Sequence, residues 1–398
     1  MSDKYLFTMM LNFVQFPGLK AGAIYLMKLL PFKLERFFAK YEFHVPYLLC
    51  ASDCESVSVR ELFKLEPGAA EAFKNLWLGY SESPGGPELR QEISQLYQQI
   101  SPDQILVHSG AEEAIFIFMN VALARGDHVI VHEPCYQSLR EVAVAIGCDV
   151  TKWTAQEQSH WELDLNFLKA NIRTDTKAII INCPHNPTGY LMSKEKFMQI
   201  VEIAGAYGIW LFSDEVYRGL EYNAEDRLPA ACDVYEHAVS LGVMSKTYGL
   251  AGLRIGWIAT PDPDMYRKME SFKDYTSICN SAPSEFLATL ALRHKEKLIQ
   301  RNREIVFNNL HLLNQFFFTH RQFFTWIAPK AGPIAFPCLN IDRESEEFCL
   351  DLAEQKGVLL LPGNYYDFDD KHFRIGFGRK NLAEGLAKFE EYIREDLF

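Results

Sequence analysis

Residues 242–257 read GVMSKTYGLAGLRIGW. Lys246 in this stretch follows residues 238–244, an apolar run typical of a buried strand, after a single serine. Exposed lysines usually lie among polar neighbours, whereas a lysine held near an apolar sheet edge has a lowered pKa. The neutral amine is then a nucleophile that reacts with an aldehyde. Arg254 follows in the same stretch and supplies a charged fork suited to phosphate. The alternative, a surface lysine in a glycine-rich loop, explains neither the strand nor the arginine.

Apolar runs like this one recur along the chain and predict seven strands. The runs are residues 104–109, 128–132, 148–153, 177–182, 209–213, 238–243 and 254–259. Helical periodicity lies between most of them, for example over residues 112–124 and 194–207. Strands that alternate with helices and are continuously apolar predict an α/β fold, with a mostly parallel seven-stranded sheet covered on both faces.

The pattern changes near residue 284, and this change predicts two domains in the chain of 398 residues. Residues 59–283 are expected to form the large domain. Residues 1–58 and 284–398 are expected to form a smaller α+β domain, with the N-terminal segment as a cover over the active site. The predicted elements of the last part are long helices, sparse strands and a final helix, at residues 284–318, 358–362, 373–377 and 381–395.

Composition and charge exclude several classes of protein. The net charge is −12, from 40 basic and 52 acidic residues, which argues against a nucleic-acid surface. No stretch reaches the length of a membrane span, and the apolar residues 6–16 lack a cleavage site, so we expect them to pack on the body. The nine cysteines form no CxxC pair, which fits a reducing, cytoplasmic compartment. His185 has no partner at ligand spacing, and no metal site is predicted.

Two further loops carry polar residues where predicted strands end. Asn186 lies in NCPHNPTG (182–189), and Asp214 and Tyr217 lie in SDEVYRG (213–219). A carboxylate at the end of a buried strand is costly unless it meets a cation or hydrogen-bond donors. The structural alternatives are an Asx turn at Asn186 and a helix N-cap at residue 213 or 214. These two stretches alone do not decide between such structural roles and a role in ligand binding.

The stretch HSGAEEAIF (108–116) predicts a strand end followed by a helix that starts near Ala111. Backbone N–H groups at a helix N-terminus bind phosphate. Acidic residues such as Glu112 in the first turn also suit the helix dipole with no ligand present, so this stretch is ambiguous when taken by itself.

Taken together, the four loops lie at one edge of an α/β sheet, where such sheets bind ligands. They offer partners for an aldehyde, a phosphate, a phenolic oxygen and a ring nitrogen, which are the groups of pyridoxal 5′-phosphate. The joint pattern NPTG…DEVY…SKTYGLAGLRIGW resembles the class I/II aminotransferases, fold-type I enzymes that use this cofactor, over nearly the whole chain. The order and spacing of Asn186, Asp214, Tyr217, Lys246 and Arg254 are similar to those of the family.

The resemblance implies a role for each of these residues. Lys246 forms the internal aldimine, Asp214 pairs with the pyridinium nitrogen, and Tyr217 hydrogen-bonds the phenolic oxygen. Arg374 in FRIGFG takes the substrate α-carboxylate, and Asn186 serves both substrate and cofactor. The other cofactor contacts that the resemblance implies are Gly110, Ala111, Glu112, Ser245 and Arg254 at the phosphate, Tyr136 stacked on the ring, and Tyr80 reaching the phosphate of a neighbouring subunit.

The resemblance implies a homodimeric transaminase of an L-amino acid and a 2-oxo acid. The same apparatus supports β-elimination, or oxidation of an amino acid such as arginine, and these alternatives stay open. A non-catalytic binding protein on the same fold is a further alternative, which the retention of every cofactor residue disfavours.

Three positions depart from the family pattern. Val243 stands where a phosphate-binding hydroxyl is common, and CASDCES (50–56) has no glycine where the family offers one near the substrate carboxylate. Tyr365 and Tyr366 add two aromatic rings to the loop that borders the substrate.

Overall fold

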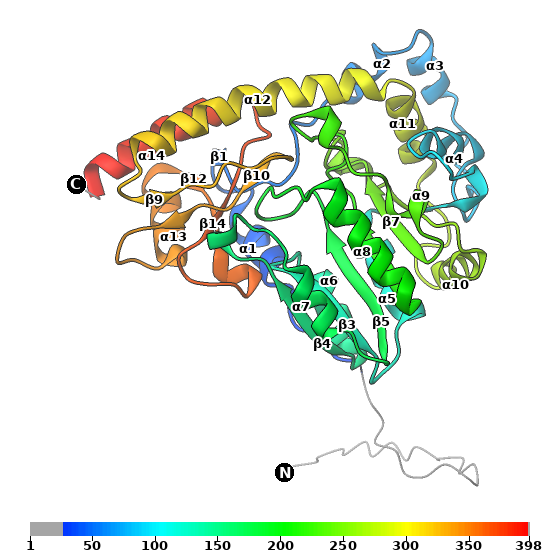
Figure 1. Ribbon diagram of the computed structural model, residues 1–398. Coiled ribbons are helices and arrows are strands. Elements are labelled where there is room, and N and C mark those ends of the chain that lie inside the picture. Colours follow the sequence, from blue (N-terminus) through cyan, green and yellow to red (C-terminus); the bar gives the residue numbers. More distant parts are fainter. Residues whose placement is uncertain (1–26, 397–398) are drawn as a thin grey trace, which may run out of the picture.

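The computed structural model describes residues 27–396, and its elements follow the predicted alternation of strands and helices (Figure 1). The strands are β1 (Tyr47–Leu48), β2 (Ile105–His108), β3 (His128–Glu133), β4 (Asp149–Thr154), β5 (Thr176–Asn182), β6 (Trp210–Asp214), β7 (Ala238–Val243), β8 (Gly256–Ala259), β9 (Phe324–Thr325), β10 (Ile334–Ala335), β11 (Cys338–Leu339), β12 (Val358–Leu359), β13 (Leu361–Pro362) and β14 (Phe373–Gly376). The helices are α1 (Lys33–Tyr41), α2 (Val59–Phe63), α3 (Ala69–Lys74), α4 (Pro87–Ser94), α5 (Ala111–Ala122), α6 (Ser138–Ile146), α7 (Leu165–Asn171), α8 (Lys194–Tyr207), α9 (Ala231–Val234), α10 (Pro263–Lys273), α11 (Ala282–Arg293), α12 (Lys295–Thr319), α13 (Ser345–Lys356) and α14 (Leu382–Asp396).

The seven predicted strands form one sheet with the order β2-β8-β7-β6-β5-β3-β4. All neighbours pair in parallel except β8, which is antiparallel to both β2 and β7. The predicted mostly parallel sheet is therefore confirmed. Because β8 is antiparallel to its neighbours, the residues that precede it lie at the same edge of the sheet as the residues that follow the parallel strands.

Alternation along the central strands explains why helices cover both faces. On β5, Ala178 and Ile180 belong to the same buried cluster as α5, whereas Ile179 and Ile181 pack with α8. Successive side chains of a strand point to opposite faces, so a run without polar residues needs cover on each side. Figure 1 shows α7 and α8 in front of the sheet and α6 behind it.

The remaining strands form three small sheets beside the large one: β1 with β12, β10-β14-β13, and β11 with β9. The long helix α12 leads away from α11 and packs on α14 (Figure 1). Residues 358–362, predicted as one strand, form two, because β12 pairs with β1 and β13 turns to pair with β14. The predicted domain boundaries at residues 58 and 283 stay a prediction.

The first helix of the described chain is the amphipathic helix α1, which buries Leu34 and Phe37. The apolar residues 6–16, expected to pack on the body, lie outside the described residues. Among residues 27–396, no helix combines the length and the apolar character needed to cross a membrane.

Candidate active site

A cavity of about 360 Å³ opens where the parallel strands of the sheet end. Strands β5, β6 and β7 end at Asn182, Asp214 and Val243, and all three residues line it. Ten of the predicted site residues line the same cavity: Ala111, Glu112, Tyr136, Asn186, Asp214, Tyr217, Ser245, Lys246, Arg254 and Arg374. The structure therefore brings together loops that are far apart in the sequence.

Lys246 lies in the turn after β7 and points its amine to the Ser52 hydroxyl, at 2.7 Å. Burial lowers the pKa of Lys246, and the nearby charge of Arg374 lowers it further, whereas Asp53 and Asp214 oppose the change. A lowered pKa raises the fraction of neutral amine near neutral pH, and the neutral amine is the nucleophilic form.

Asp214 ends β6 and is 5% exposed. The backbone N–H of Val216 donates to it at 3.2 Å. Burial raises the pKa of Asp214 to about 7, although that hydrogen bond and the charge of Lys246 favour the ionised form. A cation placed against this carboxylate would restore its charge, because an opposite charge in a buried site lowers the pKa of an acid.

Tyr217 lies one turn beyond Asp214, and its hydroxyl donates to the backbone carbonyl of Ser52 at 3.0 Å. The Lys246 amine lies 6.0 Å from the centre of the Tyr217 ring. Ser52 thus contacts both residues, one through its side chain and one through its backbone.

Arg374, on β14, is almost fully buried and is held by protein acceptors on two sides. Its Nε and Nη2 donate to the Cys50 carbonyl at 3.1 and 2.6 Å. Its Nη1 donates to Asn186 Oδ1 at 3.1 Å and to the Tyr366 hydroxyl. A guanidinium has five N–H donors, so these contacts leave one N–H of Nη2 for a ligand.

Tyr366 connects this arginine to the NPTG loop, because its hydroxyl also donates to Asn186 Oδ1 at 2.9 Å. The Asn186 backbone N–H donates to Asn182 Oδ1 at 2.7 Å, which fixes the loop on the end of β5. Since Asn186 Oδ1 accepts from both Arg374 and Tyr366, its amide nitrogen is the part turned to other partners.

Arg254 and the start of α5 form the other end of the cavity. Arg254 has a φ of 52°, and its exposed guanidinium donates to the Ala251 carbonyl at 3.1 Å. A Cβ at Gly110 would lie 2.7 Å from Arg254 Nη2, so only glycine lets the arginine approach the helix N-terminus this closely. A guanidinium beside a helix N-terminus is a site for an anion.

Glu112 and Tyr136 border this end and contact their own neighbours. Ser138 Oγ donates to Glu112 Oε2 at 3.0 Å, and burial raises the pKa of Glu112 to about 7. The Tyr136 hydroxyl donates to Glu35 Oε1, on α1, at 3.1 Å. A glutamate that is partly protonated near neutral pH repels an anion less than an ionised one does.

Two predicted residues differ from the rest in position. Gly110 lies beside the cavity at the start of α5, whereas Tyr80 lies in the loop between α3 and α4 and is 88% exposed. Within the described part of one chain, Tyr80 does not line the cavity.

Sequence reasoning missed two of the residues that organise the site, Ser52 and Tyr366. The signals were present as unexplained features: CASDCES in place of a glycine, and the tyrosine pair 365–366. The structure separates the two tyrosines, since Tyr365 donates to Glu346 at 2.9 Å and packs on Phe37, away from Arg374.

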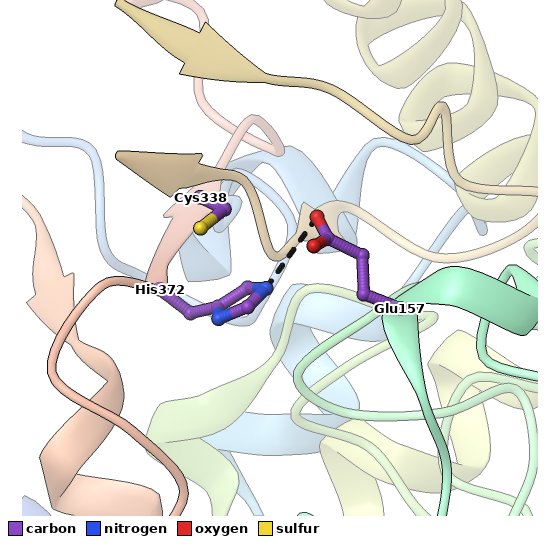
Figure 2. Close-up of side chains that lie close together, drawn as sticks. All are labelled: Glu157, Cys338 and His372. Atoms are coloured by element: carbon purple, nitrogen blue, oxygen red, sulfur yellow. Dashed lines mark ion pairs between the residues drawn. The ribbon is translucent and has the colours of Figure 1, made fainter. Parts of the chain in front are cut away.

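A second group of polar side chains lies outside the cavity, and Figure 2 shows Glu157, Cys338 and His372 close together. Their ligand atoms all lie within 4.8 Å of one another, a grouping that can also surround a metal ion. His372 Nδ1 lies 2.7 Å from Asp369, and Nε2 lies 3.5 Å from Glu157. Although burial opposes its charge, these two carboxylates raise the pKa of His372 above 6.5. A protonated imidazole has no lone pair for a metal, so we interpret the group as an ion-paired connection between the η2 turn (Glu157–Ser159) and the segment that precedes β14.

This connection predicts a pH dependence of stability. Because the pKa of His372 is higher in the folded chain than its ordinary value of 6.5, the stabilisation is fully present below that pH. It is lost as the pH rises through the folded pKa. Denaturant midpoints of the wild type and His372→Gln should therefore differ most at low pH and converge at high pH.

His311→Gln, on an exposed face of α12, is the matched control and should show no such trend. A wild-type advantage that stays constant or grows as the pH rises would contradict the ion-paired interpretation.

His185 is placed as a structural residue. Its Nδ1 contacts Thr188 Oγ1 and its Nε2 contacts the Pro134 carbonyl, each at 2.7 Å. The ring also stacks on His132 at 3.8 Å between centroids. Burial lowers the pKa of His185 to about 3, so it is a neutral ring with both nitrogens occupied.

Comparison with known proteins agrees with this geometry. The family aminotransferase class I and II matches residues 49–389, and the chain belongs to this family. A PLP-dependent aminotransferase from Streptococcus suis has a similar structure, with a TM-score of 0.87, 34% identity, and 92% of this chain and 98% of that chain covered. A PLP-dependent cyclase is also similar, with a TM-score of 0.86, 28% identity, and 94% and 100% covered. A probable aspartate aminotransferase of Methanocaldococcus jannaschii is 28% identical over 87% of this chain and 94% of its own length.

The protein is therefore a transaminase that uses pyridoxal 5′-phosphate, an amino acid and a 2-oxo acid. The residues present fit this cofactor. Buried Asp214 lacks a full counter-charge, and the exposed Arg254 guanidinium lies beside a helix N-terminus. A pyridinium nitrogen would place a positive charge against Asp214, and a phosphate would place a negative charge against Arg254 and the helix N-terminus.

Proposed function

We propose that Lys246 binds the cofactor covalently and then moves the proton of the amino acid during amino transfer. When bound, the cofactor ring accepts the electron pair left at the substrate Cα. The observation that supports this role is the buried amine of Lys246, whose pKa is lowered and which lies in the same cavity as Asp214 and Arg374. Once free, such an amine takes the proton from Cα and returns it one position away.

The other residues of the cavity hold the cofactor and the substrate. Asp214 keeps the ring nitrogen protonated, and Tyr217 and the amide nitrogen of Asn186 donate to the phenolic oxygen. Tyr136 supplies the stacking ring. The phosphate is held by the backbone of Gly110, Ala111 and Glu112, by Ser245 and by Arg254. Val243 also lines the cavity and offers no hydroxyl there, whereas Ser245 lines the same cavity and does offer one.

Arg374 binds the α-carboxylate through its remaining N–H. The hydrogen bonds to Cys50, Asn186 and Tyr366 fix the guanidinium plane before the substrate arrives. A substrate fixed at its carboxylate presents a defined bond at Cα to the cofactor ring, which is the positioning that amino transfer requires.

The experiment that tests this function follows the amino group. Holoenzyme is supplied with ¹⁵N-labelled L-amino acids, with and without a 2-oxo acid. We expect the label in the amino acid derived from that oxo acid, and none released as ammonia. Release of labelled ammonia without an acceptor indicates elimination, and peroxide formation indicates oxidation.

Ring formation on the bound amino acid is a second candidate, supported by the similarity to the PLP-dependent cyclase. Both reactions use the electron-accepting ring, so the fold does not separate them. In the labelling experiment, a cyclase retains the label in a single product and consumes no 2-oxo acid.

We also propose a homodimer, which the surface around Tyr80 supports. Five exposed apolar side chains gather on two neighbouring loops: Trp77, Leu78, Tyr80, Tyr275 and Ile278. Ser81 Oγ donates to the Asn280 carbonyl at 2.9 Å, which joins the two loops. An apolar patch of this kind marks a protein–protein contact, and Tyr80 then reaches the phosphate in the partner subunit.

Subunit complementation tests this role of Tyr80. Lys246→Ala and Tyr80→Ala chains should each be inactive as homodimers, and mixing them should restore activity, because one site of the hybrid has both residues. Tyr207, an exposed tyrosine at the end of α8, gives the control: Tyr207→Ala should stay active alone. A confirmed heterodimer without activity, or an active monomer, would show that Tyr80 serves only its own chain.

A cytoplasmic location and the division into a large domain (59–283) and a small one (1–58 and 284–398) are proposals of the same kind. The nine free cysteines support the first, because unpaired thiols persist in a reducing compartment. The parallel pairing of β1 with β12 supports the second, because it joins the N-terminal segment to the C-terminal part of the chain.

A further inference from the structure

Helix α1 turns an acidic and aromatic face to the active-site cavity. Glu35, Phe38 and Glu42 are spaced three and four residues apart, so they share one side of the helix and its C-terminal end. All three line the cavity. The family roles described above use none of them.

Neither carboxylate on this face forms an ion pair within residues 27–396. Glu35 accepts one hydrogen bond, from the Tyr136 hydroxyl. Within residues 27–396, the Glu42 carboxylate has no ion pair or hydrogen bond, whereas its neighbour Asp53 is paired with Arg379 at 2.8 Å. Burial raises the pKa of Glu42, and the charges of Asp53 and Glu35 raise it further, whereas the charges of Arg379 and Lys246 oppose the change. Carboxylates that lie close together and repel one another favour the binding of a cation between them.

The position of this face relative to Arg374 indicates which part of a substrate would lie against the two carboxylates. The Arg374 guanidinium lies 5.9 Å from the centre of the Phe38 ring, so the α-carboxylate end of a substrate lies beside α1. A side chain that extends from that end meets Glu35 and Glu42. An aspartate or glutamate side chain would be repelled there, whereas a cation would be attracted by the carboxylates and by the ring face of Phe38.

We propose that the amino donor carries a cationic side chain, a guanidinium or an alkylammonium group, which Glu35 and Glu42 recognise. This inference rests on the proposed function only in that the cavity holds the amino acid by its carboxylate at Arg374. It concerns the substrate class and holds for transfer or for ring formation.

Equilibrium binding to the holoenzyme tests the inference with two pairs of ligands that differ in charge and little in shape. L-Arginine is compared with L-citrulline, and L-lysine with L-norleucine, by calorimetry. At least one cationic ligand should bind at least about tenfold more tightly than its neutral counterpart. This factor corresponds to the free energy that a hydrogen bond to a charged group contributes. L-Glutamate should bind more weakly than either neutral ligand.

Glu35→Gln and Glu42→Gln should each reduce that preference by about tenfold while leaving the affinity for the neutral ligand unchanged. Glutamine keeps an acceptor for Tyr136, so the contact with α1 is preserved. Glu384→Gln, on an exposed position of α14, is the control and should change nothing. Equal affinities within each pair, or a preference that survives both substitutions, would overturn the inference.

Product analysis keeps this outcome separate from that of the proposed function. Amino transfer without any preference for the cationic ligand leaves transamination intact and refutes the inference. A preference that the two glutamates control, with no amino transfer, supports the substrate class and refutes transamination.

Discussion

Replacing Lys246 with alanine is expected to lower the rate of amino transfer by about 10⁴-fold or more, because the change removes both the covalent attachment and the proton carrier. The amine is the buried nucleophile of the cavity, and no other lysine lines it within the described residues. Steady-state rates measure the loss. Borohydride treatment followed by peptide mapping should find the cofactor on residue 246 in the wild type and on no residue in the variant.

Lys177→Ala removes an exposed lysine at the start of β5 and is the matched control, with activity expected to stay at the wild-type level. The assignment fails if the Lys246 variant keeps its rate, or if the cofactor maps to a different lysine in the wild type.

The second large effect is expected at Arg374. Arg374→Ala should raise KM for the amino acid by about 10²- to 10³-fold, because truncating one partner of a buried charge pair costs about 2–5 kcal/mol. The substitution also strips the Cys50 carbonyl and the Tyr366 hydroxyl of a donor. The amount of bound cofactor should stay unchanged, since Lys246, Asp214 and Arg254 lie on other loops.

Arg374→Lys should recover little of this loss, because a point charge cannot copy the planar fork that contacts Cys50, Asn186 and Tyr366 together. Arg321→Ala, at an exposed arginine after α12, controls for the loss of a positive charge. An unchanged KM in Arg374→Ala would place the carboxylate site elsewhere.

The sequence predicted those parts of the site that follow strands. Asp214, Lys246 and Arg254 lie next to apolar runs whose period and length identify them as sheet, and parallel strands end at one edge. The antiparallel β8 did not disturb this prediction, because Arg254 precedes the strand and so lies at the same edge.

Contacts between distant segments could not be predicted in this way. Ser52 and Lys246 are 194 residues apart, and Tyr366 and Asn186 are 180 apart. Neither Ser52 nor Tyr366 belongs to a periodic run that fixes the direction of its side chain, so only the packing of β1, β13 and β14 against the strand ends determines what each contacts. The split of residues 358–362 into β12 and β13 has the same origin, since two different partners compete for one apolar run.

Helix α1 also shows the difference between a local pattern, which the sequence predicts, and a contact between distant segments, which it does not. Its apolar positions Leu34 and Phe37 are buried, as expected for an amphipathic helix. The pattern of apolar and polar residues does not say what the polar side of the helix faces. The structure turns Glu35 and Glu42 into the cavity, a direction that depends on how α1 docks against Tyr136 and the loop 363–366.

A single turnover without an acceptor tests the central claim most directly. Holoenzyme is mixed with excess amino acid and no 2-oxo acid, and the products are counted against active sites. We predict one equivalent of 2-oxo acid per site and then arrest, with turnover resuming when a second 2-oxo acid is added. Continuous product formation without an acceptor, as ammonia, peroxide or a cyclised amino acid, would contradict transamination.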